Sequence, residues 1–289
     1  MDFRPTLPPP GRLVRLGLIL DTRNDWPQLS ETARMCDGAG IDVVWLEERL
    51  FGEHDVAPKD ALIVLSTIAR DVRRARLGAI LDPGSRPAGD LATTALSLDD
   101  ALGGRLELSF TAGPGEYVSI VRGLLGRPTL AIVGDTSAAF DVAARVADDV
   151  VLPPSDPGDA ARFVDLLRAA CDRSGRDVAT IGVAMVVPVS IGRTTAEASE
   201  RAEADPPFQR VGDPREIGVF GTLEQCQERV IELAHAGVSD LRCVVPNAPD
   251  MPDVLAQLTA IAIGTVDVLT PGSPRSKSPD PPQAWGGRA

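Results

Sequence analysis

The chain has 289 residues, of which 44% are apolar and 24% are charged. This length accommodates one large domain or two ordinary ones, and the apolar fraction excludes disorder of the whole chain. The formal net charge of −12 argues against nucleic acid or an anionic membrane as the main partner, because both require concentrated Lys and Arg. No apolar run reaches the ~18 residues of a membrane span, and prolines interrupt the N-terminus where a signal peptide needs an apolar core. We therefore expect a soluble, cytoplasmic protein.

Cysteine and histidine are few and scattered. The four cysteines show no CxxC spacing and stand at Cys36, Cys171, Cys226 and Cys243. This spacing argues against a zinc ribbon, a redox dithiol or a secreted disulfide framework, and it is typical of small buried side chains. His54 and His235 are the only histidines, too few for a multi-histidine metal centre. We therefore expect no metal site.

Short runs rich in β-branched residues alternate with longer amphipathic runs, a pattern that predicts βα units around a parallel sheet. The predicted strands cover residues 14–20, 43–47, 75–81, 106–111, 129–133, 149–152, 181–187 and 241–245. The predicted helices cover residues 27–39, 58–71, 87–102, 137–147, 157–174, 223–236 and 251–268. Strands and helices in this number and order favour an α/β fold of the (β/α)8 TIM-barrel type over a doubly wound sheet.

Two segments depart from the regular alternation. Between the fourth and fifth strands there is room for only a short helix at 116–125, so the fourth βα unit is predicted to be shortened. Residues 188–222 are predicted to form an irregular excursion with one helical run at 195–204. We expect an N-terminal extension over 1–12, a single barrel domain over 13–269 and a disordered tail rich in Pro, Ser and Gly over 270–289.

In a barrel of this kind the active site lies where strands end, so the residues that follow the strands are the candidates. The most specific stretch follows the fifth strand, where Gly134, Asp135, Thr136 and Ser137 open a helix. Glycine permits close approach of a ligand, and the hydroxyls add donors beside the free N–H groups of a helix start, which suits a phosphate. Ordinary capping of the helix by Asp135 or Thr136 explains the same residues, so both interpretations stay open.

Charged residues also follow the second strand. Glu47, Glu48 and Arg49 either line a pocket at its carboxyl end or form a solvated ion pair. His54 comes next in the same loop, and it either exchanges a proton near neutral pH or lies on the surface. The residues alone do not choose between these alternatives.

A set of longer stretches resembles one known family. The stretches are residues 40–49 (GIDVVWLEER), 76–80 (RLGAI) with Arg86 and Pro87, 97–100 (SLDD) with 103–108 (GGRLEL), 132–136 (IVGDT) with 143–148 (AARVAD), and 221–225 (GTLEQ) with 236–240 (AGVSD). They occur in the right order across nearly the whole predicted barrel. In these stretches the chain resembles a shortened member of the bacterial luciferase-like monooxygenase superfamily, which includes flavin monooxygenases and enzymes that use the deazaflavin coenzyme F420.

The resemblance implies a barrel whose strand ends bind the ring of FMN or coenzyme F420, two cofactors that these residues do not distinguish. It also implies a bulge or a non-prolyl cis peptide at the third strand that supports the ring. By position, Gly78, Ala79 and Ile80 would back the ring, and Thr111 would lie near it. Gly134, Asp135, Thr136 and Ser137 would receive the cofactor phosphate.

The same resemblance marks two departures. Members usually carry an Asp-His or Glu-His pair after the second strand, where this chain has Glu48 and Arg49, and His-Pro after the third, where it has Arg86 and Pro87. Arginine cannot act as a general base near neutral pH, although it can hold an anion. We therefore expect Glu48 and Arg49 to be catalytic by orienting the substrate or a peroxide-like intermediate.

Two hypotheses about function follow. In the first, the protein is a luciferase-like oxidoreductase or monooxygenase that uses reduced flavin or coenzyme F420 to transfer a hydride or activated oxygen to a small organic substrate. In the second, the barrel has lost catalysis and binds flavin or a protein partner, as the missing histidines and the shortened fourth unit suggest. Either form could be a homodimer or another oligomer. The barrel with its phosphate site favours the enzyme.

Overall fold

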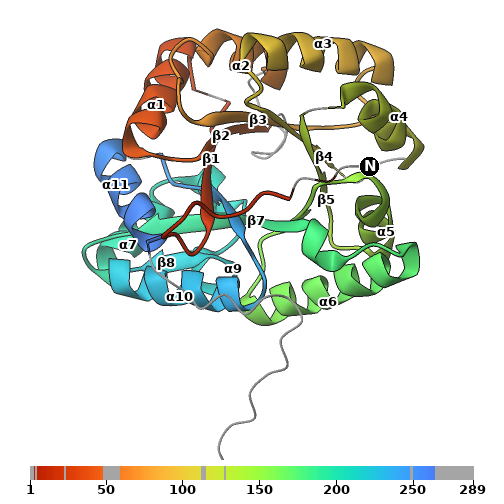
Figure 1. Ribbon diagram of the computed structural model, residues 1–289. Coiled ribbons are helices and arrows are strands. Elements are labelled where there is room, and N and C mark those ends of the chain that lie inside the picture. The colour runs from red at the N-terminus through yellow and green to blue at the C-terminus, as the bar shows by residue number, and fades with distance from the viewer. Residues whose placement is uncertain are drawn as a thin grey trace, which may run out of the picture.

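The structure, a computed structural model, describes residues 3, 5–22, 24–47, 59–111, 115–126, 128–247 and 250–263. It is a (β/α)8 TIM barrel with the helices outside the strands (Figure 1). The strands are β1 (Arg15–Leu20), β2 (Val43–Glu47), β3 (Arg76–Leu81), β4 (Leu106–Thr111), β5 (Thr129–Val133), β6 (Asp149–Leu152), β7 (Gly182–Ile191), β8 (Val219–Gly221) and β9 (Asp240–Val244). They pair in parallel in the order β6-β5-β4-β3-β2-β1-β9-β7, and pairing of β6 with β7 closes the barrel. The predicted fold class is confirmed.

Helices link successive strands, as expected from the alternating pattern. They are α1 (Trp26–Ala39), α2 (Ala61–Ile68), α3 (Ala88–Ala101), α4 (Gly115–Leu125), α5 (Ser137–Val146), α6 (Pro157–Ser174), α10 (Leu223–His235) and α11 (Met251–Ile261), with a 3-10 turn η1 (Val178–Thr180) before β7. The eleven-residue α4 between β4 and β5 confirms the short fourth unit. Helix α2 starts later than predicted because Asp60 caps it, accepting hydrogen bonds from the N–H groups of Leu62 and Ile63.

The excursion after the seventh predicted strand is more regular than expected. Strand β7 continues past Pro188, because its pairing with β9 ends at that residue and pairing with β8 begins at Val189. Proline can stand at such a change of partner, since no ladder bond needs its missing N–H. Three helices then connect β7 to β8, namely α7 (Thr195–Glu203), α8 (Pro206–Gln209) and α9 (Pro214–Ile217).

The C-terminal end of the described chain meets the N-terminal segment. Helix α11 ends at Ile261, earlier than predicted, and Ile263 then forms an antiparallel bridge with Arg12 of the N-terminal segment. Residues 264–289 lie outside the described part of the chain, so the domain limit at 269 and the tail stay predictions. The four cysteines are free and buried, as the scattered spacing indicated.

Alternation along the strands and the register between them sort the inward side chains into layers. From the N-terminal end of the barrel toward the C-terminal end, three layers come from β2, β4, β6 and β9. The charged layer holds Val43, Glu107, Asp149 and Asp240, the tryptophan layer holds Trp45, Ser109, Val151 and Arg242, and the mouth layer holds Glu47, Thr111, Pro153 and Val244. The odd-numbered strands place Gly17, Gly78, Ala131 and Ala184 below the tryptophan layer, and Ile19, Ile80, Val133 and Val186 above it.

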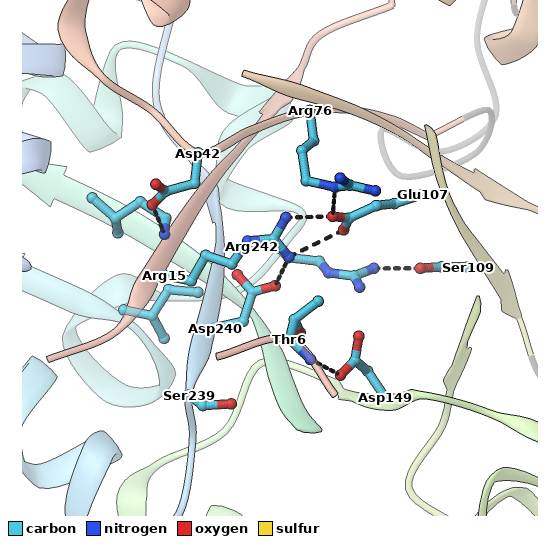
Figure 2. Close-up of polar contacts among 12 residues, drawn as sticks. Thr6, Arg15, Asp42, Arg76, Glu107, Ser109, Asp149, Ser239, Asp240 and Arg242 are labelled. Carbon is cyan, nitrogen blue, oxygen red and sulfur yellow. Dashed lines mark hydrogen bonds and ion pairs between the residues drawn. The ribbon is translucent and has the colours of Figure 1, made fainter. Parts of the chain in front are cut away.

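Ion pairs hold the charged layer together (Figure 2). Arg15 bonds both oxygens of Glu107 and lies 3.4 Å from the Asp240 carboxylate, and Arg76 adds a second cation at 2.5 Å from Glu107. Burial alone would raise the pKa of Glu107, but the charges of Arg15 and Arg76 outweigh it and hold that pKa below its usual range. Removing one member would leave a buried charge unpaired, at a cost of about 3–5 kcal/mol.

The N-terminal segment closes this end of the barrel. The Thr6 N–H donates a hydrogen bond of 2.9 Å to the Asp149 carboxylate, and Gly182 leaves the space that this carboxylate fills, because a Cβ there would lie 2.1 Å from Asp149 Oδ1. The Phe3 ring lies 3.6 Å from the Arg176 guanidinium, a cation–π contact. The described residues of this segment thus contact the closed end of the barrel, although they are only partly buried or exposed.

Asp149→Asn is expected to stabilise the protein at pH 8 and to have little effect at pH 4. Burial raises the pKa of Asp149 from 3.8 to about 7. The free energy of unfolding therefore falls as the pH rises from 4 to 7, because the carboxyl group ionises more easily in the unfolded chain, and it levels off above pH 7. A shift from 3.8 to about 7 corresponds to at most about 4 kcal/mol, at about 1.4 kcal/mol per pKa unit. The amide keeps an acceptor for the Thr6 N–H.

The measurement is urea unfolding of both proteins between pH 4 and 8. Asp100→Asn, at an exposed position on α3, is the matched control and should show no such pH trend. A stability difference between Asp149→Asn and the parent that stays constant over this range would contradict the assignment.

Candidate functional site

Tryptophan fills the centre of the barrel and sets the depth of its open end. The Trp45 side chain is fully buried between the positions of two glycines, and Cβ atoms added at Gly17 and Gly78 would lie 2.6 and 2.2 Å from its indole atoms. The Arg242 guanidinium stacks on the indole, 3.7 Å from the ring centroid, and Nη1 donates to the Ser109 hydroxyl at 2.6 Å. The centre of the barrel is therefore filled by side chains at the tryptophan layer.

The C-terminal end of the barrel carries two polar side chains over an apolar floor. The floor consists of Ile19, Ile80, Val133 and Val186, which belong to the same apolar cluster as Trp45. Above it lie the partly buried Glu47 and Thr111 of the mouth layer, and the Thr111 hydroxyl lies 3.4 Å from the Leu81 carbonyl. This arrangement suits a flat apolar ligand with a few polar atoms at its edge.

The residues expected to back a cofactor ring face in different directions. Gly78 lies under Trp45, and Ala79 points outward into the cluster that packs under the helices. Of the three, Ile80 is the one that faces the open end of the barrel. Strand β3 also pairs with β4 in an unbroken register from Leu77 to Leu81, and the described peptide bonds are all trans. The expected bulge or cis peptide is therefore wrong for this structure, in which Trp45 occupies the space beside the strand.

The residues expected to receive phosphate lie together at the start of α5. Thr136 is the N-cap, and its hydroxyl accepts a 3.2 Å hydrogen bond from the Ala139 N–H, so the capping interpretation holds. The Gly134 N–H is used by the sheet, because it donates to the Val151 carbonyl. Asp135, Thr136 and Ser137 are exposed, and within the described residues the Ser137 N–H has no acceptor. The helix start thus retains donors that a phosphate could use.

The expected catalytic pair lies beyond what the structure describes. Glu48, Arg49 and His54 fall in the gap between residues 47 and 59, so their roles stay predictions. The neighbouring Glu47 is described. The sequence pattern placed it with Glu48 and Arg49 after the second strand, but only those two were expected to be catalytic. Burial raises the pKa of Glu47 to about 7, although the charge of Arg242 acts in the opposite direction. Nothing in the sequence distinguishes this inward glutamate from the two charges that follow it.

Arg86, which stands where the family usually has histidine, is held by its surroundings. Its guanidinium lies 3.1 Å from the carboxylate of Asp60, the N-cap of α2, and its carbonyl accepts a hydrogen bond from the Tyr117 hydroxyl. The side chain therefore joins α2 to the loop after β3.

The excursion after β7 covers part of the open end. Phe208 on α8 is buried and belongs to the same apolar cluster as the floor residues, and Asp205 accepts a hydrogen bond from the Asn247 N–H after β9. The cavity beside β1 that Asp205 and Asn247 help to line measures about 30 Å³. This is far below the roughly 300 Å³ or more of a typical ligand pocket, so the cavity is too small for an organic ligand.

Comparison with known proteins finds one family that the first part of the barrel resembles. Residues 13–124 match the model of the family described as luciferase-like monooxygenase. Over these residues, less than half of the chain, the protein is similar to that family. The matched region runs from β1 into α4, which includes the second-strand and GGR stretches that carry the resemblance. The sequence has no significant match among curated proteins.

Solved structures of luciferase-like proteins share the fold. A coenzyme F420-dependent tetrahydromethanopterin reductase from Methanopyrus kandleri superimposes with a TM-score of 0.71 at 14% identity, covering 86% of this chain and 98% of that chain. A riboflavin lyase with modified FMN gives 0.71 at 13% identity, covering 86% and 91%. An EDTA monooxygenase from Chelativorans sp. BNC1 gives 0.69 at 15% identity, covering 86% and 93%. At these identities the likeness establishes the fold alone.

Among the described residues, no helix is long and apolar enough to cross a membrane. In the same residues, no group of His, Cys, Asp and Glu side chains has the arrangement of a metal site. The candidate ligand-binding groups described above lie at two places, the mouth layer and the start of α5.

Gly78→Ala is expected to destabilise the protein by about 3 kcal/mol, because its Cβ would overlap the buried indole of Trp45. Urea unfolding measures the loss. Gly123→Ala on α4 is the matched control, since a Cβ there meets nothing within 4 Å and should stabilise the helix by about 0.5–1 kcal/mol. Equal stability of Gly78→Ala and the parent would mean that Trp45 does not fill the barrel centre.

Proposed function

We propose that the protein is an oxidoreductase that uses reduced flavin or coenzyme F420 to transfer a hydride or activated oxygen to a small organic substrate. The observation that carries this proposal is that two candidate binding places lie at the C-terminal end of the barrel. One is the pair of polar side chains over the apolar floor, and the other is the exposed start of α5. Similar barrels include an F420-dependent reductase, a protein that holds modified FMN and an EDTA monooxygenase.

The donor chemistry at the start of α5 fits a phosphate. Thr136 and Ser137 each offer a hydroxyl, and the Ser137 N–H lies at the positive end of the helix dipole. These groups would hold the phosphate that FMN and coenzyme F420 both carry. Asp135 is a carboxylate in the same turn and would point away from an anion or repel it.

The floor of the mouth fits one face of a flat ring, provided that the ring lies above Trp45 and not on Gly78. Ile80 would contact the ring from below, and Thr111 would offer its edge a hydroxyl. When bound, the reduced cofactor would supply the hydride or the activated oxygen. The chain itself would bind and orient both molecules, exclude water with the floor residues and supply protons.

A second function is favoured by a specific observation. Phe208 and the excursion that carries it already cover part of the mouth. A barrel closed in this way could bind flavin, or a protein partner, without turnover. Assembly into a homodimer or another oligomer is compatible with both functions, and we propose it on the family resemblance alone.

The deciding experiment is a calorimetric or fluorescence titration of the purified protein with oxidised FMN and, separately, with coenzyme F420. Micromolar binding of one cofactor is expected and would identify it. Turnover with the reduced form would then eliminate the second function, whereas binding without turnover would favour it. Absence of binding by either cofactor would overturn the proposal.

Replacing both Thr136 and Ser137 by Ala is expected to weaken cofactor binding by about 100-fold, since two hydrogen bonds to a charged phosphate contribute about 1.5 kcal/mol each. Thr194→Ala is the matched control, because Thr194 caps α7 in the same way and its loss also costs a helix cap. Titration with the cofactor that binds measures the effect. Unchanged affinity in the double variant would remove the phosphate from the start of α5.

A further inference from the structure

Glu47 occupies an inward position on β2 for which the fold provides no structural role. Val43 and Trp45 belong to the inner cluster of the barrel, whereas Val44 and Leu46 belong to the outer core under the helices. Alternation therefore directs Glu47 inward, and its register with Ile80 places it over the apolar floor. Within the described residues its carboxylate has no hydrogen bond and no ion pair, and the one charge that acts on it is that of Arg242.

The acids of the charged layer provide the contrast. Glu107 bonds two arginines, Asp240 faces Arg15, and Asp149 accepts the Thr6 N–H (Figure 2). Each of these carboxylates is part of the packing that closes the N-terminal end. Glu47 lies at the opposite end, in the same layer as Thr111, where the barrel opens.

Among the residues that the structure describes, few charged groups lie near Glu47. Arg242 lies one layer below and is tied to Trp45 and Ser109. Asp21 and Asp82 follow the neighbouring strands β1 and β3, and Lys59 is held by the Thr22 and Asn24 carbonyls. Burial allows the carboxyl group of Glu47 to keep its proton near neutral pH. When the proton leaves, the positive charge of Arg242 in the layer below stabilises the carboxylate.

We propose that Glu47 is the catalytic residue that exchanges a proton with the substrate at the mouth of the barrel. This proposal rests on the proposed function and deepens it. In the hydride reaction, the acceptor carbon gains a C–H bond and the electron pair of its double bond moves to the adjoining heteroatom. The Glu47 carboxyl group gives that atom a proton and becomes a carboxylate, which solvent reprotonates. The hydride that forms the new C–H bond, one hydrogen with its two electrons, would come from the reduced cofactor.

The first test needs no ligand. Carboxyl carbons of glutamate are labelled with ¹³C, and Glu47→Gln identifies the Glu47 signal. The expected titration midpoint is about 7. A midpoint near the ordinary value of about 4.3 would overturn the proposal and leave the proposed function intact.

The second test measures protons taken up when FMN or coenzyme F420 binds. Calorimetry in two buffers of different ionisation enthalpy at pH 7 reports this number. We expect uptake of a fraction of a proton in the parent protein, loss of that uptake in Glu47→Gln, and retention in Glu31→Gln, which removes an exposed acid on α1. Binding with the same uptake in Glu47→Gln would overturn this proposal alone, whereas failure of both cofactors to bind would overturn the proposed function and this proposal with it.

With turnover established, Glu47→Gln should lower kcat at least 100-fold and remove the limb of the pH–rate profile near pH 7. Glu47→Asp should restore part of the rate and the limb. A parallel profile of unchanged shape in Glu47→Gln would show that the residue only positions its neighbours and would overturn the catalytic assignment.

Discussion

The stack of Arg242 on Trp45 is the contact that joins the two ends of this barrel. The indole needs the missing side chains of Gly17 and Gly78, and the guanidinium stacked on it needs the nearby acids to offset the cost of its burial. The positive charge of the same guanidinium also acts on Glu47 and lowers the pKa of its carboxyl group. The charged layer at the closed end and the carboxyl group of Glu47 at the other end therefore both interact with the same arginine.

This coupling explains why the closed end is built as it is. A lone buried arginine would be prohibitively costly, so Arg242 can lie in the barrel centre only above a layer of carboxylates. Those carboxylates in turn need Arg15 and Arg76, and Asp149 needs the Thr6 N–H from a segment outside the barrel. The contact between the N-terminal segment and Asp149 therefore depends, through this layer of acids, on the arginine in the barrel centre.

The fold was accessible from the sequence because its signals are local. Apolar runs gave β2, β4, β5 and β6 with their observed limits, and capping residues and prolines marked the helices. The site was less accessible, because a layer is set by register between strands far apart in the chain. Register places Glu47 in the same layer as Thr111, and it places Trp45 against Gly78. Neither contact can be predicted from one of the two segments alone. Strand β8 escaped prediction for the same reason, since three residues pair only because β7 extends past Pro188.

The position of Glu47 bears on how a luciferase-like barrel could work without the usual histidine. Arg49 stands where the family resemblance implies an imidazole, and a guanidinium does not release its proton near neutral pH. Glu47 comes two residues earlier, where burial over the apolar floor brings a carboxyl group into the same titration range as an imidazole. A neutral carboxyl group donates a proton as imidazolium does, but it becomes an anion where the imidazole becomes neutral. The cation of Arg242 beneath it is then what makes the exchange electrostatically possible, so the residue that fills the barrel centre would also tune its chemistry.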